Sequence, residues 1–210
     1  MARPLISIGI PFYNSEKTIV DTVRSVFAQS FADWELLLVD DGSIDRSLSL
    51  VQRIRNDRVS VISDGKNLKS HLRHNQIADL ARGKYIAKLD ADDMMIPDRL
   101  ERQLKFLESD PSVDLVGSGA YAIDENNHCY GIRGLDETRF DRPSSLKKAL
   151  FIQPTVTGKA EWFRKNPYDS EFTRAEDQEL WCRTCEVSNF ANINKGLLFY
   201  RDPFEVDLDK

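Results

Sequence analysis

Residues 34–43 read WELLLVDDGS, an apolar run that ends in two aspartates, a glycine and a serine. A run of this length, bounded by polar residues and a turn, is typical of a strand buried on both faces. Similar runs occur at residues 5–10, where Pro11 closes the run, and at residues 59–62 and 85–89. We therefore expect buried strands at residues 5–10 and 34–39, and two further strands at residues 59–62 and 85–89.

Between these runs, apolar residues recur at the helical period. The spacing predicts helices near residues 19–29, 48–54, 70–81 and 97–107, the third followed by Gly83 and the last opened by Pro97. With a fifth strand expected at residues 114–119, strands and helices alternate five times. This alternation indicates an α/β fold with a mostly parallel, doubly wound sheet over residues 1–120.

The pattern weakens after residue 120. We expect a hairpin turn at residues 125–127, a short helix at 143–150, an irregular strand region at 155–163 and a last strand at 196–200. A helix should also begin near Thr173, with Thr173 as its N-cap and Glu176 as its third residue, which together form a capping box. Residues 121–210 are therefore expected to form a smaller, mixed half of the same domain.

The composition suits one buried core and excludes several classes of partner. The chain has 210 residues, 41% of them hydrophobic, and a net charge of −5, which offers nucleic acid no general attraction. Residues 1–4 lead into the first strand without the hydrophobic region of a signal peptide, and no later segment reaches the length of a membrane span. We expect a cytoplasmic protein without an integral membrane segment. Peripheral association with the inner membrane face stays open.

Three unusual segments follow the predicted strands: PFYN at residues 11–14, DDGS at 40–43 and DADD at 90–93. The carboxyl ends of parallel strands are where ligands bind in open α/β sheets. Three carboxylates within four residues repel one another, and crowding near a sheet edge raises their pKa values unless a cation is present. Mg²⁺ and Mn²⁺ take oxygen ligands of this kind. The alternative is an acidic turn in which Asp93 or Asp98 caps the next helix.

Phosphate-binding glycine motifs are missing from the sequence, because neither G-x-G-x-x-G after the first strand nor G-x-x-x-x-G-K-[ST] occurs. Any phosphate site would therefore depend on metal. Tyr13 can stack on a planar base, Asp41 can accept a hydrogen bond from an imide N–H, and Arg73 can reach the same edge. Asp177 shares a helix face with Leu180 and Trp181. It is either a first-turn acid that complements the helix dipole or a partly desolvated general base.

Four blocks in the sequence resemble the family-2 glycosyltransferases, the inverting group with the GT-A fold. They read SIGIPFYNSEKTI, SVFAQSFADWELLLVDDGSIDRS, LARGKYIAKLDADDMMIPDRL and AEDQELWCR, in order across nearly the whole chain. The resemblance implies an α/β fold of GT-A type. It also implies that Pro11, Tyr13 and Asp41, assisted by Arg73, hold the nucleoside, usually uridine in this family.

The resemblance further implies that Asp90 approaches the ribose and the hydration shell of the metal, and that Asp92 binds the Mg²⁺ or Mn²⁺ that bridges a diphosphate. Asp177 would be the catalytic base. The implied partners are a nucleotide-sugar donor, expected to be a UDP-sugar, and a glycan or lipid-linked acceptor. Family members generally continue well past LLFYR, whereas this chain ends nine residues after Arg201, so it is either a short member or a truncated catalytic core.

Two other functions remain open on the sequence alone. The first is a non-catalytic module that binds nucleotide sugars. The second is a metal-dependent phosphohydrolase, although the aspartyl-nucleophile type places D-x-D-x-[TV] after its first strand, and here the acidic cluster follows the fourth.

Overall fold

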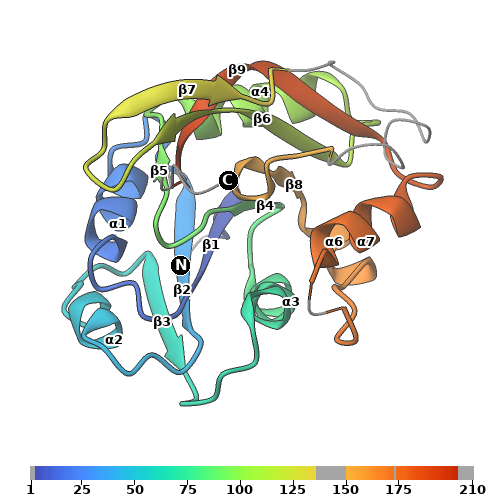
Figure 1. Ribbon diagram of the computed structural model, residues 1–210. Coiled ribbons are helices and arrows are strands. Elements are labelled where there is room, and N and C mark those ends of the chain that lie inside the picture. Colours follow the sequence, from blue (N-terminus) through green and yellow to red (C-terminus); the bar gives the residue numbers. More distant parts are fainter. Residues whose placement is uncertain (1–2, 136–149, 173, 203–210) are drawn as a thin grey trace, which may run out of the picture.

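The computed structural model describes residues 3–135, 150–172 and 174–202. Within these ranges the strands form one nine-stranded sheet in the order β3-β2-β1-β4-β8-β6-β9-β5, with β7 paired to β6. Figure 1 shows β6, β7 and β9 running across the top of the molecule, while β2 and β3 descend on the left. The strands are β1 (Ile6–Phe12), β2 (Trp34–Asp40), β3 (Val59–Ser63), β4 (Tyr85–Lys88), β5 (Met94–Met95), β6 (Leu115–Ile123), β7 (Cys129–Arg133), β8 (Thr157–Lys159) and β9 (Phe190–Arg201).

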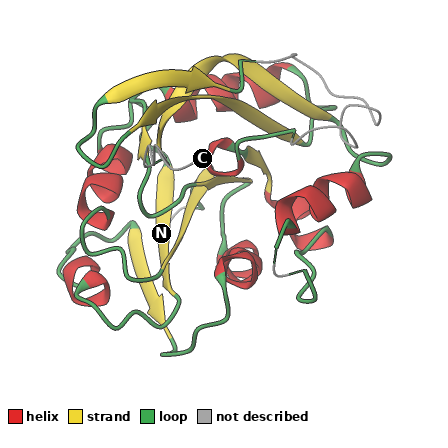
Figure 2. Cartoon of the chain, viewed as in Figure 1, coloured by secondary structure: helices red, strands yellow, loops and turns green. Residues whose placement is uncertain are grey.

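Helices cover both faces of the parallel part of the sheet (Figures 1 and 2). Hydrophobic side chains of α1, α2 and α4 pack in one core, and those of α3, α6 and α7 pack in the other. This arrangement confirms the doubly wound expectation. The helices are α1 (Ile19–Phe27), α2 (Ser47–Val51), α3 (Ser70–Leu80), α4 (Arg99–Ser109), α6 (Ala160–Lys165) and α7 (Glu176–Thr184), with a 3₁₀ turn η1 (Gln153–Thr155).

Strand β2 shows why residues 36–39 are an unbroken apolar run. Leu36 and Leu38 lie in the core beneath α1, whereas Leu37 and Val39 face the other core. Successive side chains on a strand point to opposite faces, so a strand covered on both sides needs apolar residues at every position. Each buried leucine contributes about 1.5–3 kcal/mol relative to an exposed one.

The parallel centre of the sheet agrees with the prediction. Strand β1 lies between β2 and β4 and is parallel to both, and β3 extends the parallel set beyond β2. The carboxyl ends of these four strands therefore meet at one edge of the sheet. Because neighbouring strands lie about 4.8 Å apart, the ends of β2 and β4 are separated by about 10 Å, with the end of β1 between them.

The second half differs from the prediction in several places. The fifth predicted strand, now β6, does not pair with β4, because β8 lies between them and is antiparallel to both. Residues 155–163 form not an irregular strand region but the short strand β8 followed at once by α6. The last strand is longer than expected and pairs in parallel with β6. The predicted helix at residues 143–150 lies almost wholly outside the described residues.

The predicted hairpin turn at residues 125–127 is confirmed: it joins β6 to β7, with Asn127 at a φ of 66°. Among the described residues, no helix is both long and apolar enough to span a bilayer.

Candidate active site

One cleft brings together two acids that are far apart in the sequence. Asp90, just after β4, and Asp177, the second residue of α7, both line a cavity of about 480 Å³. We call this cavity the cleft. The other walls come from the start of α3, the segment around η1, the loop between α6 and α7, the start of α7 and single residues of β7 and β9. They include His71, His74, Gln153, Tyr168 and Tyr200.

The acidic cluster after β4 is crowded in the way the sequence predicted. Asp90 is half-buried, Asp92 is exposed and Asp93 is buried. Burial, with the neighbouring Asp92 second, raises the pKa of Asp90 to about 7. Burial, with Asp90 second, raises the pKa of Asp93 to about 9, and burial also raises the pKa of Asp92. The expected upward shift of these pKa values is therefore confirmed.

Two buried cations compensate part of this negative charge, and sequence analysis did not identify them. The side chain of Lys88 is 2% exposed, and Arg99 is fully buried. Arg99 Nη2 donates to the carbonyl oxygen of Lys88 at 2.9 Å. Burial lowers the pKa of Lys88 to about 8 and that of Arg99 to about 9. The sequence did contain a signal for Lys88: a lysine inside the apolar run 85–89 predicts a buried charge, and a buried charge needs a partner of opposite sign.

The carboxylates of Asp90 and Asp92 suit a hard divalent cation. In the described part of the chain, neither carboxylate has a hydrogen-bond partner on another residue, so their oxygens are not committed elsewhere. Across the same ranges no group of three or more His, Cys, Asp or Glu side chains could hold a metal. Mg²⁺ commonly uses one or two carboxylates and completes its shell with substrate phosphates and water, so two free carboxylates fit it.

Asp93 is partly engaged within the fold, although its buried Oδ2 has no hydrogen-bond partner among the described residues. Its Oδ1 accepts a hydrogen bond from the backbone N–H of Arg201 at 2.8 Å, which joins the acidic turn to the end of β9. Neither Asp93 nor Asp98 caps α4 through its side chain. The acidic-turn alternative in its helix-capping form is therefore wrong.

Asp177 points into the cleft and is held there by a tyrosine. The hydroxyl of Tyr168 donates to Asp177 Oδ1 at 2.6 Å, and Lys88 Nζ lies 3.9 Å from the same oxygen. The predicted capping box is wrong: α7 begins at Glu176 itself, preceded by Ala175 at a φ of 57°, so Glu176 is not the third helical residue. Thr173 lies outside the described residues.

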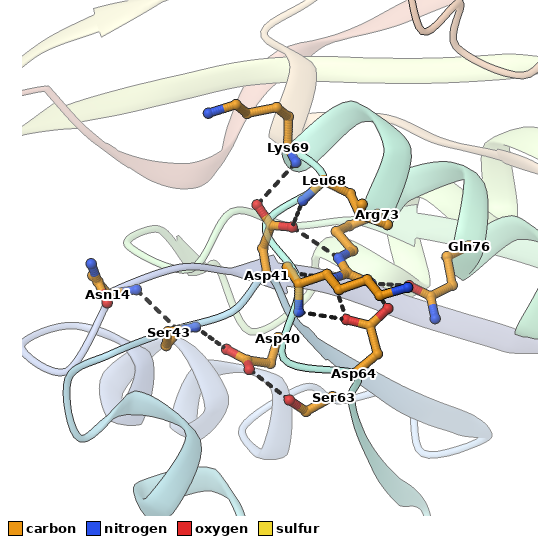
Figure 3. A network of polar contacts seen from close by, with 11 residues as sticks. Asn14, Asp40, Asp41, Ser43, Ser63, Asp64, Leu68, Lys69, Arg73 and Gln76 are labelled. Atoms are coloured by element: carbon orange, nitrogen blue, oxygen red, sulfur yellow. Dashed lines mark hydrogen bonds and ion pairs between the residues drawn. The ribbon is translucent and has the colours of Figure 1, made fainter.

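Asp41 is the centre of a buried polar network after β2 (Figure 3). Its Oδ1 accepts from the backbone N–H of Leu68 at 2.7 Å and from Arg73 Nε at 2.9 Å, while Oδ2 accepts from the backbone N–H of Lys69 at 3.1 Å. The carboxylate therefore fixes the loop that precedes α3. One lone-pair direction on Oδ2 remains for a further donor, since an ionised carboxylate offers about four.

Arg73 has no N–H left for a ligand. Its Nε binds Asp41, and its two terminal nitrogens bind both oxygens of Asp64, the Gln76 side chain and the carbonyl of Lys66 (Figure 3). These contacts use all five guanidinium donors. Arg73 is thus placed to hold Asp41 and residues 64–66. The hydrogen bond from Arg73 also lowers the pKa of Asp64 to about 2.

The end of β1 lies beside Asp41. Pro11 is buried opposite Val39, and the carbonyl of Phe12 accepts from the backbone N–H of Asp41 at 2.8 Å. Tyr13, the next residue, is 48% exposed. The loop after β1 is joined to the loop after β2 by hydrogen bonds in both directions between Asn14 and residues 43–44.

Comparison with known proteins relates this arrangement to one family. Residues 7–172 match the family described as "Glycosyl transferase family 2". The chain is 31% identical over 211 residues to an uncharacterised glycosyltransferase of Methanocaldococcus jannaschii, covering 97% of this chain and 72% of the relative. It is 32% identical to the putative glycosyltransferase EpsE of Bacillus subtilis, covering 94% and 72%.

A third relative carries a more specific name. It is the "UDP-Glc:alpha-D-GlcNAc-diphosphoundecaprenol beta-1,3-glucosyltransferase WfgD" of Escherichia coli, 28% identical, with 92% of this chain and 75% of the relative covered.

Solved structures show the same fold. TarS residues 1–349 of S. aureus, in complex with UDP, superimposes with a TM-score of 0.79 at 21% identity. The match covers 94% of this chain and 60% of the TarS chain, so the present chain spans less than two thirds of that structure. The likeness confirms the expected GT-A-type fold. The family match covers most of the sequence and agrees with this fold, so the chain belongs to glycosyltransferase family 2.

Proposed function

We propose that the protein transfers a sugar from a nucleoside-diphosphate donor to an acceptor hydroxyl, with inversion at the anomeric carbon and with the help of a divalent cation. The single observation that carries the proposal is that Asp90 and Asp177 line one cleft. An acid placed for a metal-bound diphosphate and an acid placed for a proton are then available to the same substrate. The TarS structure of the same fold is a complex with UDP, which supports UDP-sugars as the first donors to test.

In this proposal the ends of β1 and β2 hold the nucleoside. Tyr13 offers an exposed ring for stacking on the base, and Pro11 forms the floor of the nucleoside site. Asp41 accepts a hydrogen bond from the imide N–H of the base with its remaining lone pair. Arg73 assists by fixing Asp41, because all of its own donors are engaged. Asp90 would lie near the ribose and would help to hold a bound cation.

Asp92, with Asp90 beside it, would hold Mg²⁺ or Mn²⁺. When bound, such an ion would neutralise the negative charge that grows on the diphosphate. Asp177 accepts the proton of the acceptor hydroxyl as the hydroxyl oxygen attacks the anomeric carbon. The bond from that carbon to the diphosphate oxygen breaks on the opposite face, and the nucleoside diphosphate leaves. A well-placed base of this kind contributes about 10²–10⁴-fold to the rate.

The acceptor side is assigned to the second half of the domain, residues 121–210, of which the start of α7, Arg133 of β7 and Tyr200 of β9 line the cleft. A glycan or lipid-linked acceptor is proposed, because the name of WfgD specifies a diphosphoundecaprenol-linked acceptor. The cytoplasmic location expected from the sequence stays a prediction.

A thermal-shift panel followed by a turnover assay tests the proposal. UDP should raise the melting temperature only when Mn²⁺ or Mg²⁺ is added, and Asp92→Ala should abolish this shift. Asp79→Ala is the matched control, because Asp79 is exposed on α3 and lies outside the cleft. A shift without metal, or none with any nucleotide, would contradict the donor site. Metal-dependent binding without transfer to any acceptor or to water would favour the non-catalytic module.

A further inference from the structure

Tyr168 is held more firmly than a loop residue requires. Its backbone N–H donates to Asn75 Oδ1 at 2.8 Å, and its carbonyl accepts from Asn75 Nδ2 at 2.9 Å, so one side-chain amide on α3 clamps both of its backbone groups. Its ring is buried and packs near the rings of His74 and His71, at centroid distances of 6.1 and 6.4 Å. The ring position is thereby fixed from α3.

Lys88 and Gln153 both contact the hydroxyl of Tyr168, and the hydroxyl donates to Asp177. Lys88 Nζ contacts the hydroxyl oxygen, and an ammonium group can only donate, so that oxygen must accept. The single hydroxyl proton is left for Asp177 Oδ1, at 2.6 Å. In the part of the chain that the structure describes, Asp177 Oδ2 has no hydrogen-bond partner. One carboxylate oxygen is thus tethered while the other stays available to a substrate.

We propose that Tyr168 is a positioning residue for the transfer reaction, which holds the Asp177 carboxylate in one orientation in the cleft while Lys88 fixes the direction of its hydroxyl. The inference rests on the proposed role of Asp177 as the base. Without the hydroxyl, the nearest cation to Asp177 is the buried ammonium of Lys88, 3.9 Å away. The carboxylate then turns toward that ammonium and away from the incoming acceptor.

Tyr168→Phe isolates this effect, because it keeps the packed ring and removes one oxygen. We expect kcat to fall by about 10–100-fold, the scale associated with misplacing a reacting group by about 1 Å. The KM for the donor and the metal-dependent thermal shift with UDP should stay within about twofold of the parent values, because the donor contacts lie on other residues. Tyr130→Phe is the matched control: its hydroxyl donates to the Asp202 carbonyl, outside the cleft, and kcat should not change.

A double-mutant cycle shows whether Tyr168 acts through Asp177. In the Asp177→Asn background, Tyr168→Phe should cost nothing further, because the group it positions can no longer take a proton. Equal losses in both backgrounds would overturn the inference and assign Tyr168 a general structural role. A raised KM with unchanged kcat would also overturn it, since Tyr168 would then be a donor contact.

Two further results separate this inference from the proposed function. If Asp177→Asn retains kcat, the assignment of the base is wrong and the positioning role falls with it. If Asp177→Asn is inactive but Tyr168→Phe is unimpaired, only the positioning role is wrong. Should Tyr168→Phe fail to fold, Asn75→Ala tests the same arrangement, because it removes both hydrogen bonds that clamp the backbone of Tyr168. Its loss of kcat should likewise vanish in the Asp177→Asn background, and a loss that persists there contradicts the inference.

Discussion

Replacing Lys69 by glycine should stabilise the protein. Lys69 immediately precedes α3 and has a φ of 80° and a ψ of 153°. This region of backbone space is accessible essentially only to glycine, and a residue held in it costs about 1–3 kcal/mol. The surrounding network imposes the conformation, because Asp41 accepts from the backbone N–H of both Leu68 and Lys69. Neither hydrogen bond needs the lysine side chain.

The expected gain is the relieved strain less the cost of a more flexible unfolded chain. Glycine adds about 0.4–1 kcal/mol of unfolded-state entropy, so the net stabilisation should be about 1 kcal/mol. For a domain of this size, that corresponds to a rise of about 2–4 °C in melting temperature. Urea unfolding followed by the fluorescence of the buried tryptophans would measure the change in the free energy of unfolding.

Lys66→Gly is the matched control. Lys66 lies in the same exposed loop and loses the same charge, but its φ is not positive, and the carbonyl that Arg73 contacts is retained. It should therefore lose about 0.4–1 kcal/mol. If Lys69→Gly proves no more stable than Lys66→Gly, the argument from backbone strain is refuted.

Two predictions concern the network around Arg73. Arg73→Met should lower the free energy of unfolding by about 3–5 kcal/mol, because it leaves the buried Asp41 without its cation. Arg24→Met is the control in the same urea experiment: it breaks only an exposed pair with Asp21 and should cost less than about 1 kcal/mol. Since the folded-state pKa of Asp64 is depressed to about 2 from a usual 3.8, its contribution to stability is present above pH 3.8 and lost as the pH falls through 2. An acid titration of stability should show a smaller loss in Arg73→Met than in the parent protein, because the hydrogen bond from the Lys66 backbone N–H to Asp64 remains, and an identical acid response in both would contradict the assignment.

The parallel half of the fold could be predicted because its signals are local. The apolar runs that became β1, β2 and β4 are buried on both faces, and the helix between the first two begins and ends within two residues of its predicted bounds. The second half could not be predicted in this way. Strand β8 has three residues, and its insertion between β4 and β6 is a long-range pairing that no local pattern encodes.

Only some residues of the candidate site could likewise be predicted from the sequence. Acids at strand ends are visible in the sequence, because their position follows from strand direction, and Asp90 and Asp177 do share a cleft. Tyr168 lies in a loop without periodicity, so nothing in its neighbourhood indicates a contact with Lys88 or Asn75. The sequence also suggested that a bound cation alone relieves the acidic repulsion, whereas Lys88 and Arg99 already relieve part of it from inside the fold.

The position of β8 has a consequence for the order of synthesis. Strand β4 pairs with β1 on one side, but its other side is completed only when residues 157–159 have been made. Until then, a nascent chain carries β4 as an open edge with unpaired backbone groups, which is a template for aggregation. We therefore expect that the N-terminal half does not fold as a free-standing module, and that a fragment that stops after α4 precipitates.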